Sequence, residues 1–229
     1  ELLSRRFYWG MLAVVFALGL LPVIPYADNH KFLMLYWLIA LATMQGARCI
    51  GEQARLMIGL VFMFAVVWKC LTPDFLNGSF LAFSLLADSR FAGFTSTVLG
   101  VSYDALSSNQ QSAAIVDGAS VAGVLLCSSS RVDSVAVWMT WWTIAIEAGV
   151  ALCFLVRRFQ LAGHILLAAF IFSTYALANV PGFSWTLCIM GIVSSRSSQL
   201  RWIYVGLFLL TQFYRLPWVQ LFSGFESTT

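Results

Sequence analysis

The stretch SVAVWMTWWTIAIEAGVALCFLV, residues 134–156, decides the fold class. Its 23 residues contain a single charged side chain, Glu147. A helix of about 20 apolar residues is long enough to cross the hydrocarbon core of a membrane, which is about 30 Å thick. This stretch therefore predicts a transmembrane helix that carries one buried carboxyl group.

The composition of the whole chain agrees with that prediction. Of the 229 residues, 60% are hydrophobic and only 10% are charged, whereas soluble domains have about 45–50% apolar and about 25% charged residues. The net charge is +3 and the thirteen Lys and Arg residues are scattered. These numbers exclude a disordered tail, a disulfide-stapled secreted module and a nucleic-acid-binding domain.

Six further apolar stretches are candidate spans, which makes seven in total. Six or eight spans are the alternatives. We expect an all-α, polytopic transmembrane bundle that forms a single domain over residues 1–229. The other six stretches are residues 8–26, 32–45 (extended if 46–50 continues the helix), 56–71, 160–178, 183–193 and 201–222.

A long mixed segment, residues 74–133, separates the third and fourth spans. It contains Ser, Gly and Asp but also two apolar and moderately helical parts, residues 75–86 and 113–126. Loops longer than about 12–15 residues are usually functional or disordered. Because of its apolar content, we expect this segment to form interfacial helices on the outer face.

Orientation follows from the positive-inside rule, which places Lys and Arg of short loops in the cytoplasm. With the N-terminus inside, the inner loops contain eight cations and the outer loops three. We therefore expect a cytoplasmic N-terminus and an outer C-terminus. The eight are Arg5, Arg6, Arg48, Arg55, Arg157, Arg158, Arg196 and Arg201, and the three are Lys31, Arg90 and Arg131.

Glu147 and His164 are expected to lie inside the membrane, on consecutive spans. Helical rise of about 1.5 Å per residue places them about 15 Å and about 9 Å from the turn between these spans. One reading is a polar pair that holds two helices together. Another is a proton relay or ligand contact, and a third is no contact between them.

Lys69 and His30 are both expected at the outer face. Lys69 ends the third span and either extends its ammonium group to the headgroups or is a desolvated amine that acts as a general base. His30 lies in an outer turn and is either solvated or part of the same site. Arg215, with aromatic neighbours, is expected to contact an aromatic ring or a lipid phosphate.

Four segments together resemble the HTTM family, the transmembrane part of vitamin K-dependent gamma-glutamyl carboxylase and its bacterial relatives. In order, they cover most of residues 1–200. They are Asp28-Asn29-His30, the run Lys69-Cys70-Leu71-Thr72-Pro73-Asp74-Phe75-Leu76-Asn77-Gly78, the span with Glu147, and Gly163-His164 followed by Pro181-Gly182-Phe183-Ser184-Trp185.

The resemblance implies a chemistry and a location. In the carboxylase, the lysine that Lys69 matches is the candidate base in oxygenation of vitamin K hydroquinone, and His30 matches a histidine near it. The bacterial relatives imply a bacterial inner membrane. Phe75 replaces the usual Trp, one extra residue separates Lys69 from Asp74, and the large lumenal domain is absent, so we do not expect peptide carboxylation.

Two function classes follow. In the first, the chain binds or oxidises a lipophilic quinone-type molecule, with Lys69 and His30 as catalytic residues and a quinone or lipid as cofactor. In the second, it is a non-catalytic accessory or scaffold subunit whose partners are membrane lipid and other membrane subunits. The five cysteines show no CxxC or paired spacing, so we expect no metal site.

Overall fold

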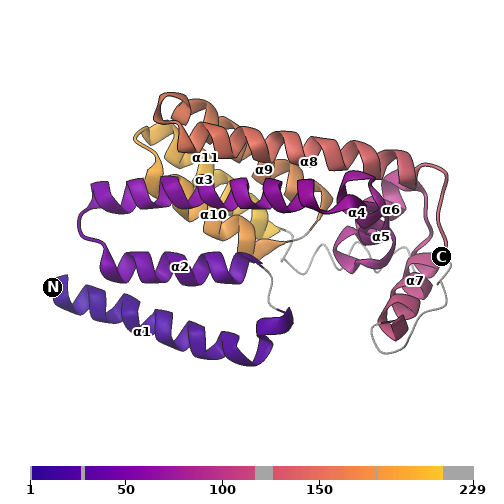
Figure 1. The fold of residues 1–229 in the computed structure, drawn as a ribbon, viewed down its shortest axis with the longest axis horizontal. Helices are drawn as coiled ribbons and strands as arrows, with labels where there is room; N and C mark the ends of the chain where they lie inside the picture. The colour runs from indigo at the N-terminus through magenta and orange to yellow at the C-terminus, as the bar shows by residue number, and fades with distance from the viewer. Residues whose placement is uncertain (1, 27–28, 117–125, 179, 214–229) are drawn as a thin grey trace. The chain divides into compact units, whose positions relative to one another are not determined.

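A computed structural model describes residues 2–26, 29–116, 126–178 and 180–213. All regular structure in these residues is helical, which confirms the all-α prediction (Figure 1). The longer helices are α1 (Leu2–Leu20), α2 (Asn29–Thr43), α3 (Ala47–Leu71), α8 (Val132–Leu155), α9 (Gln160–Leu177), α10 (Pro181–Ser194) and α11 (Ser198–Phe213). The shorter elements are η1 (Leu21–Tyr26), α4 (Pro73–Leu76), α5 (Ser79–Ala87), η2 (Ser89–Phe91), α6 (Ala92–Leu99), α7 (Tyr103–Val116) and η3 (Arg157–Phe159).

The helix lengths do not support seven full spans. Within the described part of the chain, three helices are long and apolar enough to cross a membrane: Arg6–Ile24, Ala47–Leu71 and Val132–Leu155. Helix α2 has 15 residues and α10 has 14, and such helices extend only about 21–22 Å at about 1.5 Å per residue. The apolar runs in these two helices were identified correctly, but their lengths fall short of about 20 residues.

The boundaries of the strongest predicted spans agree with the structure. Helix α8 begins at Val132, and Asp133 in its first turn is favourable for the helix dipole. Helix α3 ends at Leu71, before Pro73, as expected. It begins at Ala47, however, nine residues earlier than the predicted start at 56, because the chain turns at Gly46, whose φ is +80°. Of the two alternatives for α2, the one without an extension through residues 46–50 therefore holds, because residues 47–50 belong to α3.

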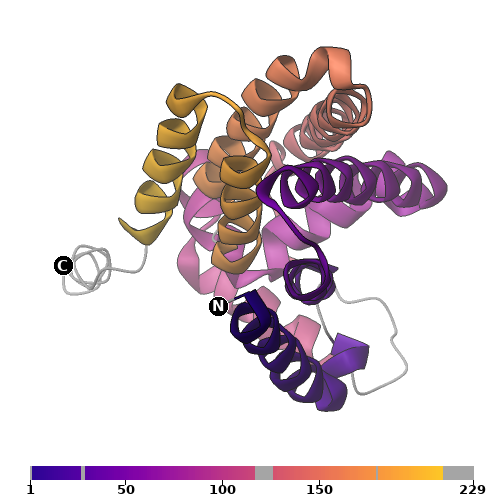
Figure 2. The same cartoon turned by 90° about the vertical axis from the view of Figure 1, so that its left-hand side faces the viewer.

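The chain divides into two compact units. The first comprises Glu1–Val61, Val150–Phe172 and Val180–Thr229, and the second comprises Phe62–Gly149 and Ser173–Asn179. In the first unit, α1 and α2 run antiparallel and in contact (Figure 1). Helix α10 contacts both α2 and α11, and Figure 2 shows α10 and α11 side by side.

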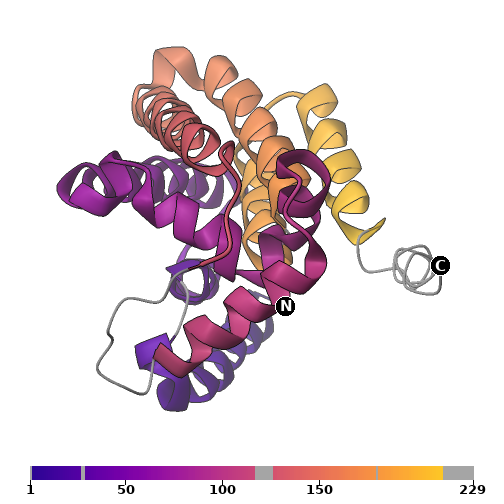
Figure 3. The same cartoon turned by 90° about the vertical axis from the view of Figure 1, so that its right-hand side faces the viewer.

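The second unit contains the segment expected on the outer face. Residues 74–116 fold into α4, α5, η2, α6 and α7, so this part of the segment is helical, whereas residues 117–125 of the second part expected to be helical lie outside the described residues. Figure 3 shows these short helices in magenta and pink, and α5 contacts α4, α6 and α7. Pro73 begins α4 at a first-turn position where its missing N–H costs nothing.

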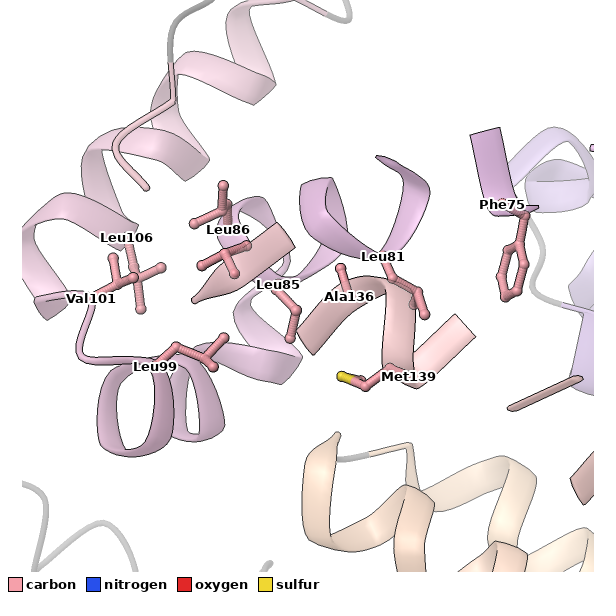
Figure 4. Packing of buried hydrophobic residues seen from close by; sticks show 10 residues of the cluster. Phe75, Leu81, Leu85, Leu86, Leu99, Val101, Leu106, Ala136 and Met139 are labelled. Carbon is pink, nitrogen blue, oxygen red and sulfur yellow. The ribbon is translucent and has the colours of Figure 1, made fainter. Parts of the chain in front are cut away.

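A hydrophobic cluster joins these short helices to the first half of α8. Leu81 and Leu85 of α5 lie beside Ala136 and Met139 of α8 (Figure 4). Gly78 allows this approach: its φ is +84°, and a Cβ atom there would lie 2.8 Å from Cγ2 of Val137. A residue with a side chain would be both strained and obstructed at this position.

Candidate functional site

The second unit brings two of the predicted residues into direct contact. Lys69 lies in the last turn of α3 and Glu147 lies in α8, and the Lys69 Nζ donates a hydrogen bond to Oε2 of Glu147. Only 16% of the lysine side chain and 7% of the glutamate side chain are exposed. The ammonium group also lies 5.3 Å from the centre of the Phe75 ring, within the range of a cation–π interaction.

The pair does not lie at an end of α8. Glu147 is 15 residues past the start of α8 at Val132, so about 22 Å of helix lies between that start and the pair. Beyond Lys69, α4 and α5 continue along this part of α8 through Phe75, Gly78 and Leu81. Lys69 therefore ends its own helix, but it lies level with the interior of α8.

This position changes the interpretation of Lys69. The sequence left open whether the ammonium group extends to the headgroups or lies in a desolvated site. In the structure the ammonium group lies over the Phe75 ring and contacts a buried carboxylate. An isolated charge costs several kcal/mol to bury, and a charge of opposite sign with a hydrogen bond compensates for part of that cost.

The contact allows one proton to occupy either of two positions. With the proton on nitrogen, the pair is an ammonium and a carboxylate; with the proton on oxygen, it is an amine and a carboxylic acid. Lysine can undergo this exchange when it is desolvated, whereas arginine keeps its proton in proteins. The pair can therefore accept a proton from a bound acid or return one to a bound base.

His164 has a different neighbourhood, in the first unit. Its Nδ1 lies 2.9 Å from the hydroxyl of Tyr204, and this hydroxyl donates to the backbone carbonyl of His164 at 3.3 Å. The Phe154 ring packs edge-on against the imidazole at 5.0 Å. Glu147 thus contacts Lys69 and His164 contacts Tyr204, so the structure gives each member of the predicted polar pair another partner.

His30 also lies in the first unit, near the start of α2. Its imidazole is half-buried, and its ring centre lies 6.3 Å from that of Phe183 in α10. Gly182 lies beside the imidazole, and a Cβ atom there would be in ordinary contact with Nε2 of His30 at 3.4 Å. The start of α2 and the start of α10 therefore meet at His30 and Phe183.

Sequence reasoning missed a polar cluster in the first unit. Glu52 accepts from Arg55 at 2.9 Å and from Arg157 at 3.1 Å. Arg55, which is only 4% exposed, also donates to the backbone carbonyls of Phe154 and Leu155 at the end of α8. The spacing of Glu52 and Arg55, three residues apart on a helix, was the available signal.

The described residues contain no group of three His, Cys, Asp or Glu side chains that could hold a metal ion. Arg215, which the sequence placed at an interface, lies outside the described residues. Comparisons with protein families, with curated proteins and with solved structures found no match for this chain.

Proposed function

We propose that the chain is an integral membrane protein of the inner membrane, with a cytoplasmic N-terminus and a carboxylase-like arrangement of helices. Three long apolar helices support membrane insertion. Exposed apolar side chains support it too, because Trp68, Trp138 and Trp202 are all more than 60% exposed on helices. Arg6 and Arg201, both expected inside, line one cavity of the first unit, which supports their placement at the same membrane face.

Within this protein, the Lys69–Glu147 pair binds and deprotonates a lipophilic quinol. The observation that carries the proposal is the direct contact of an amine with a carboxylate, both largely buried among apolar helices. Ionisable side chains within membrane helices are costly and are functional candidates by default. The resemblance of residues 69–78 to the carboxylase segment supports a hydroquinone as the acid.

The proton moves in a relay that leaves the lysine charged. The quinol hydroxyl transfers its proton to Nζ of Lys69 as Nζ transfers one of its own to Oε2 of Glu147. The products are a quinol anion, an ammonium group and a carboxylic acid, so every proton is conserved. The anion is then paired with the ammonium, which stabilises it electrostatically in a medium of low dielectric constant.

Anaerobic titration of a short-chain naphthohydroquinone with the reconstituted protein tests this relay. The parent protein should lower the apparent pKa of the bound quinol, seen in its ultraviolet spectrum, and a protonated carboxyl band should appear in the infrared. Lys69→Arg should bind the quinol but show neither change, because guanidinium does not release its proton.

The chain provides a matched control, since Lys31 is its only other lysine. Lys31→Arg should titrate as the parent does. Glu147→Gln should bind the quinol without the infrared band. A full pKa shift of the bound quinol in Lys69→Arg would show that the Lys69–Glu147 pair does not take part in the reaction. An equal loss of that shift in both lysine variants would show the same.

A subunit role is the second candidate, and the surface of α8 favours it. Trp138 and Trp142 stack with ring centres 5.8 Å apart and an interplanar angle of 4°, and both rings are exposed. Aromatic side chains are frequent anchors of protein interfaces. Purification in mild detergent should then yield a stoichiometric membrane partner that is lost in Trp138→Ala; recovery of the chain alone contradicts this role.

A further inference from the structure

The first unit contains a cavity that the quinol proposal does not use. Its volume is about 520 Å³, and it is lined by the beginning of α1, the turn between α2 and α3, and facing parts of α10 and α11. Ligand cavities in proteins commonly measure about 300–1,000 Å³. The cavity is therefore large enough for a small molecule or for part of a lipid.

Two arginines give the cavity a positive charge. Arg6 of α1 and Arg201 of α11 both line it, and none of its lining residues is acidic. Arg201 donates from Nε and Nη2 to the carbonyl of Ser195, at 3.2 and 3.0 Å. The amide oxygen of Gln45, in the orientation that satisfies both groups, accepts from Arg6. These partners are neutral, so within the described residues neither positive charge has an acidic partner.

The rest of the lining is apolar. Trp9, Met44 and Ile192 belong to three different helices or their ends, and they face the same cavity as the two guanidinium groups. A ligand that fits both parts has an anionic group for the arginines and a hydrocarbon part for the apolar wall. Arginine binds phosphate with paired hydrogen bonds, and basic pockets between membrane helices on the cytoplasmic side bind anionic lipid headgroups.

We propose that this cavity binds an anionic glycerophospholipid, with its phosphate between Arg6 and Arg201 and an acyl chain along Trp9, Met44 and Ile192. The proposal requires the membrane location proposed above but is independent of the Lys69–Glu147 pair. The lipid ties the first turns of α1 and α11 to the turn between α2 and α3. Free phosphate has the same charged group but lacks the hydrocarbon part.

Native mass spectrometry of the full chain in non-ionic detergent tests the proposal with three probes. These are short-chain phosphatidylglycerol, phosphatidylcholine of the same chain length, and inorganic phosphate. Phosphatidylglycerol should bind with a stoichiometry of one, and Arg6→Gln and Arg201→Gln should each weaken its binding about fivefold, from about 1 kcal/mol per cation near anionic lipid. The double variant should lose 20-fold or more, and Arg6→Lys should retain most of the affinity.

Arg158→Gln is the matched control. Arg158 is exposed, does not line the cavity and belongs to the same predicted membrane face, so its substitution should leave phosphatidylglycerol binding unchanged. If Arg201→Gln fails to fold because it loses its bonds to Ser195, Arg6→Gln alone decides the result.

Three results would overturn the proposal. They are equal binding of the two lipids, equal weakening by Arg158→Gln and Arg6→Gln, and phosphate binding as tight as that of phosphatidylglycerol through the same arginines. The last would identify a site for free phosphate. Fractionation of the chain with membranes separates these results from failure of the membrane proposal, and the quinol titration is unaffected by all three.

Discussion

Near its start, helix α3 contributes Glu52 to a cluster with two arginines, whereas near its end it contributes Lys69 to a single pair with Glu147. Glu52 is 26% exposed, and the Arg157 that reaches it is 70% exposed. Lys69 and Glu147 are 16% and 7% exposed. One helix thus carries a partly solvated group of charges, centred on the buried Arg55, at one end and a secluded pair at the other.

The two groups differ in how many charged partners remain when one partner is lost. If Arg157 is lost, Glu52 keeps its hydrogen bond to Arg55, and Arg196 lies 4.0 Å from its other carboxylate oxygen. Within the described part of the chain, the side chains of Lys69 and Glu147 hydrogen-bond only to each other. Arginine also stays protonated, whereas a desolvated lysine can release its proton. The cluster is therefore suited to holding helices in place, and the pair is suited to proton exchange.

The largest effect should come from breaking the buried pair. Glu147→Gln leaves the Lys69 ammonium without a countercharge, and we expect a loss of about 3–5 kcal/mol in unfolding free energy. Adding Lys69→Met should recover much of that loss, because the double variant has no buried charge. Chemical unfolding in detergent measures both, and Lys31→Met controls for the loss of an amine elsewhere. Additive losses in the double variant would show that the two residues do not interact.

Arg55→Lys should have the next largest effect. A lysine cannot form the planar fork that bonds both to Glu52 and to the carbonyls ending α8. We expect a loss of about 2–3 kcal/mol, from hydrogen bonds to a charged group that is buried. Arg48→Lys, two turns earlier and exposed, should change the unfolding free energy little. Equal, small effects of the two substitutions would place Arg55 with the solvated charges.

Much of the fold could be predicted from local sequence. The apolar run of α8, the stop of α3 before Pro73 and the turn at Arg157 were all predictable because each depends on neighbouring residues. The early start of α3 was not predictable, because residues 47–55 carry three charges, a pattern that is typical of a loop between spans. Two of those charges, Glu52 and Arg55, are accommodated by each other and by α8 carbonyls, which are distant in sequence.

Sequence reasoning singled out both Lys69 and Glu147, but it did not predict that they contact each other. Lys69 and Glu147 stood out because ionisable residues in apolar runs are costly. Counting residues from the Arg157 turn suggested His164 as the partner of Glu147, since the two are on consecutive helices. The actual partner is 78 positions away. It is brought there because α4 and α5 pack along α8, an arrangement that depends on Gly78 and the cluster around Leu85.

A smaller loss of unfolding free energy should distinguish the exposed Arg157 from the buried Arg55 within the Glu52 cluster. Arg157→Gln removes a 3.1 Å contact made by a side chain that is 70% exposed, and such pairs contribute up to about 1 kcal/mol. The loss should shrink further at high salt, since exposed charges are screened. Unfolding at two salt concentrations measures it. A loss as large as that of Arg55→Lys would mean that the cluster has no redundancy.

The smallest effect concerns an ion pair outside the long helices, which serves as a reference for both ends of α3. Burial of the Asp88 carboxyl raises its pKa, but the hydrogen bonds and charge of Arg90 outweigh burial, so the pKa lies below its usual value of 3.8. Arg90 donates from its guanidinium at 2.6–3.0 Å and from its amide at 2.9 Å.

Because the folded state lowers this pKa, the ionised carboxylate stabilises the protein above pH 3.8, and that contribution is lost as the pH falls through the lower folded value. Asp88→Asn keeps an oxygen that can accept from the Arg90 amide, so it removes mainly the charge. We expect it to cost about 0.5 kcal/mol or less at neutral pH, since both side chains are partly exposed. The difference from the parent should disappear toward pH 2. A difference in unfolding free energy that persists in acid would come from the shape of the Asp88 side chain and not from its charge. The Asp88–Arg90 pair would then no longer serve as an electrostatic reference for Lys69 and Glu147.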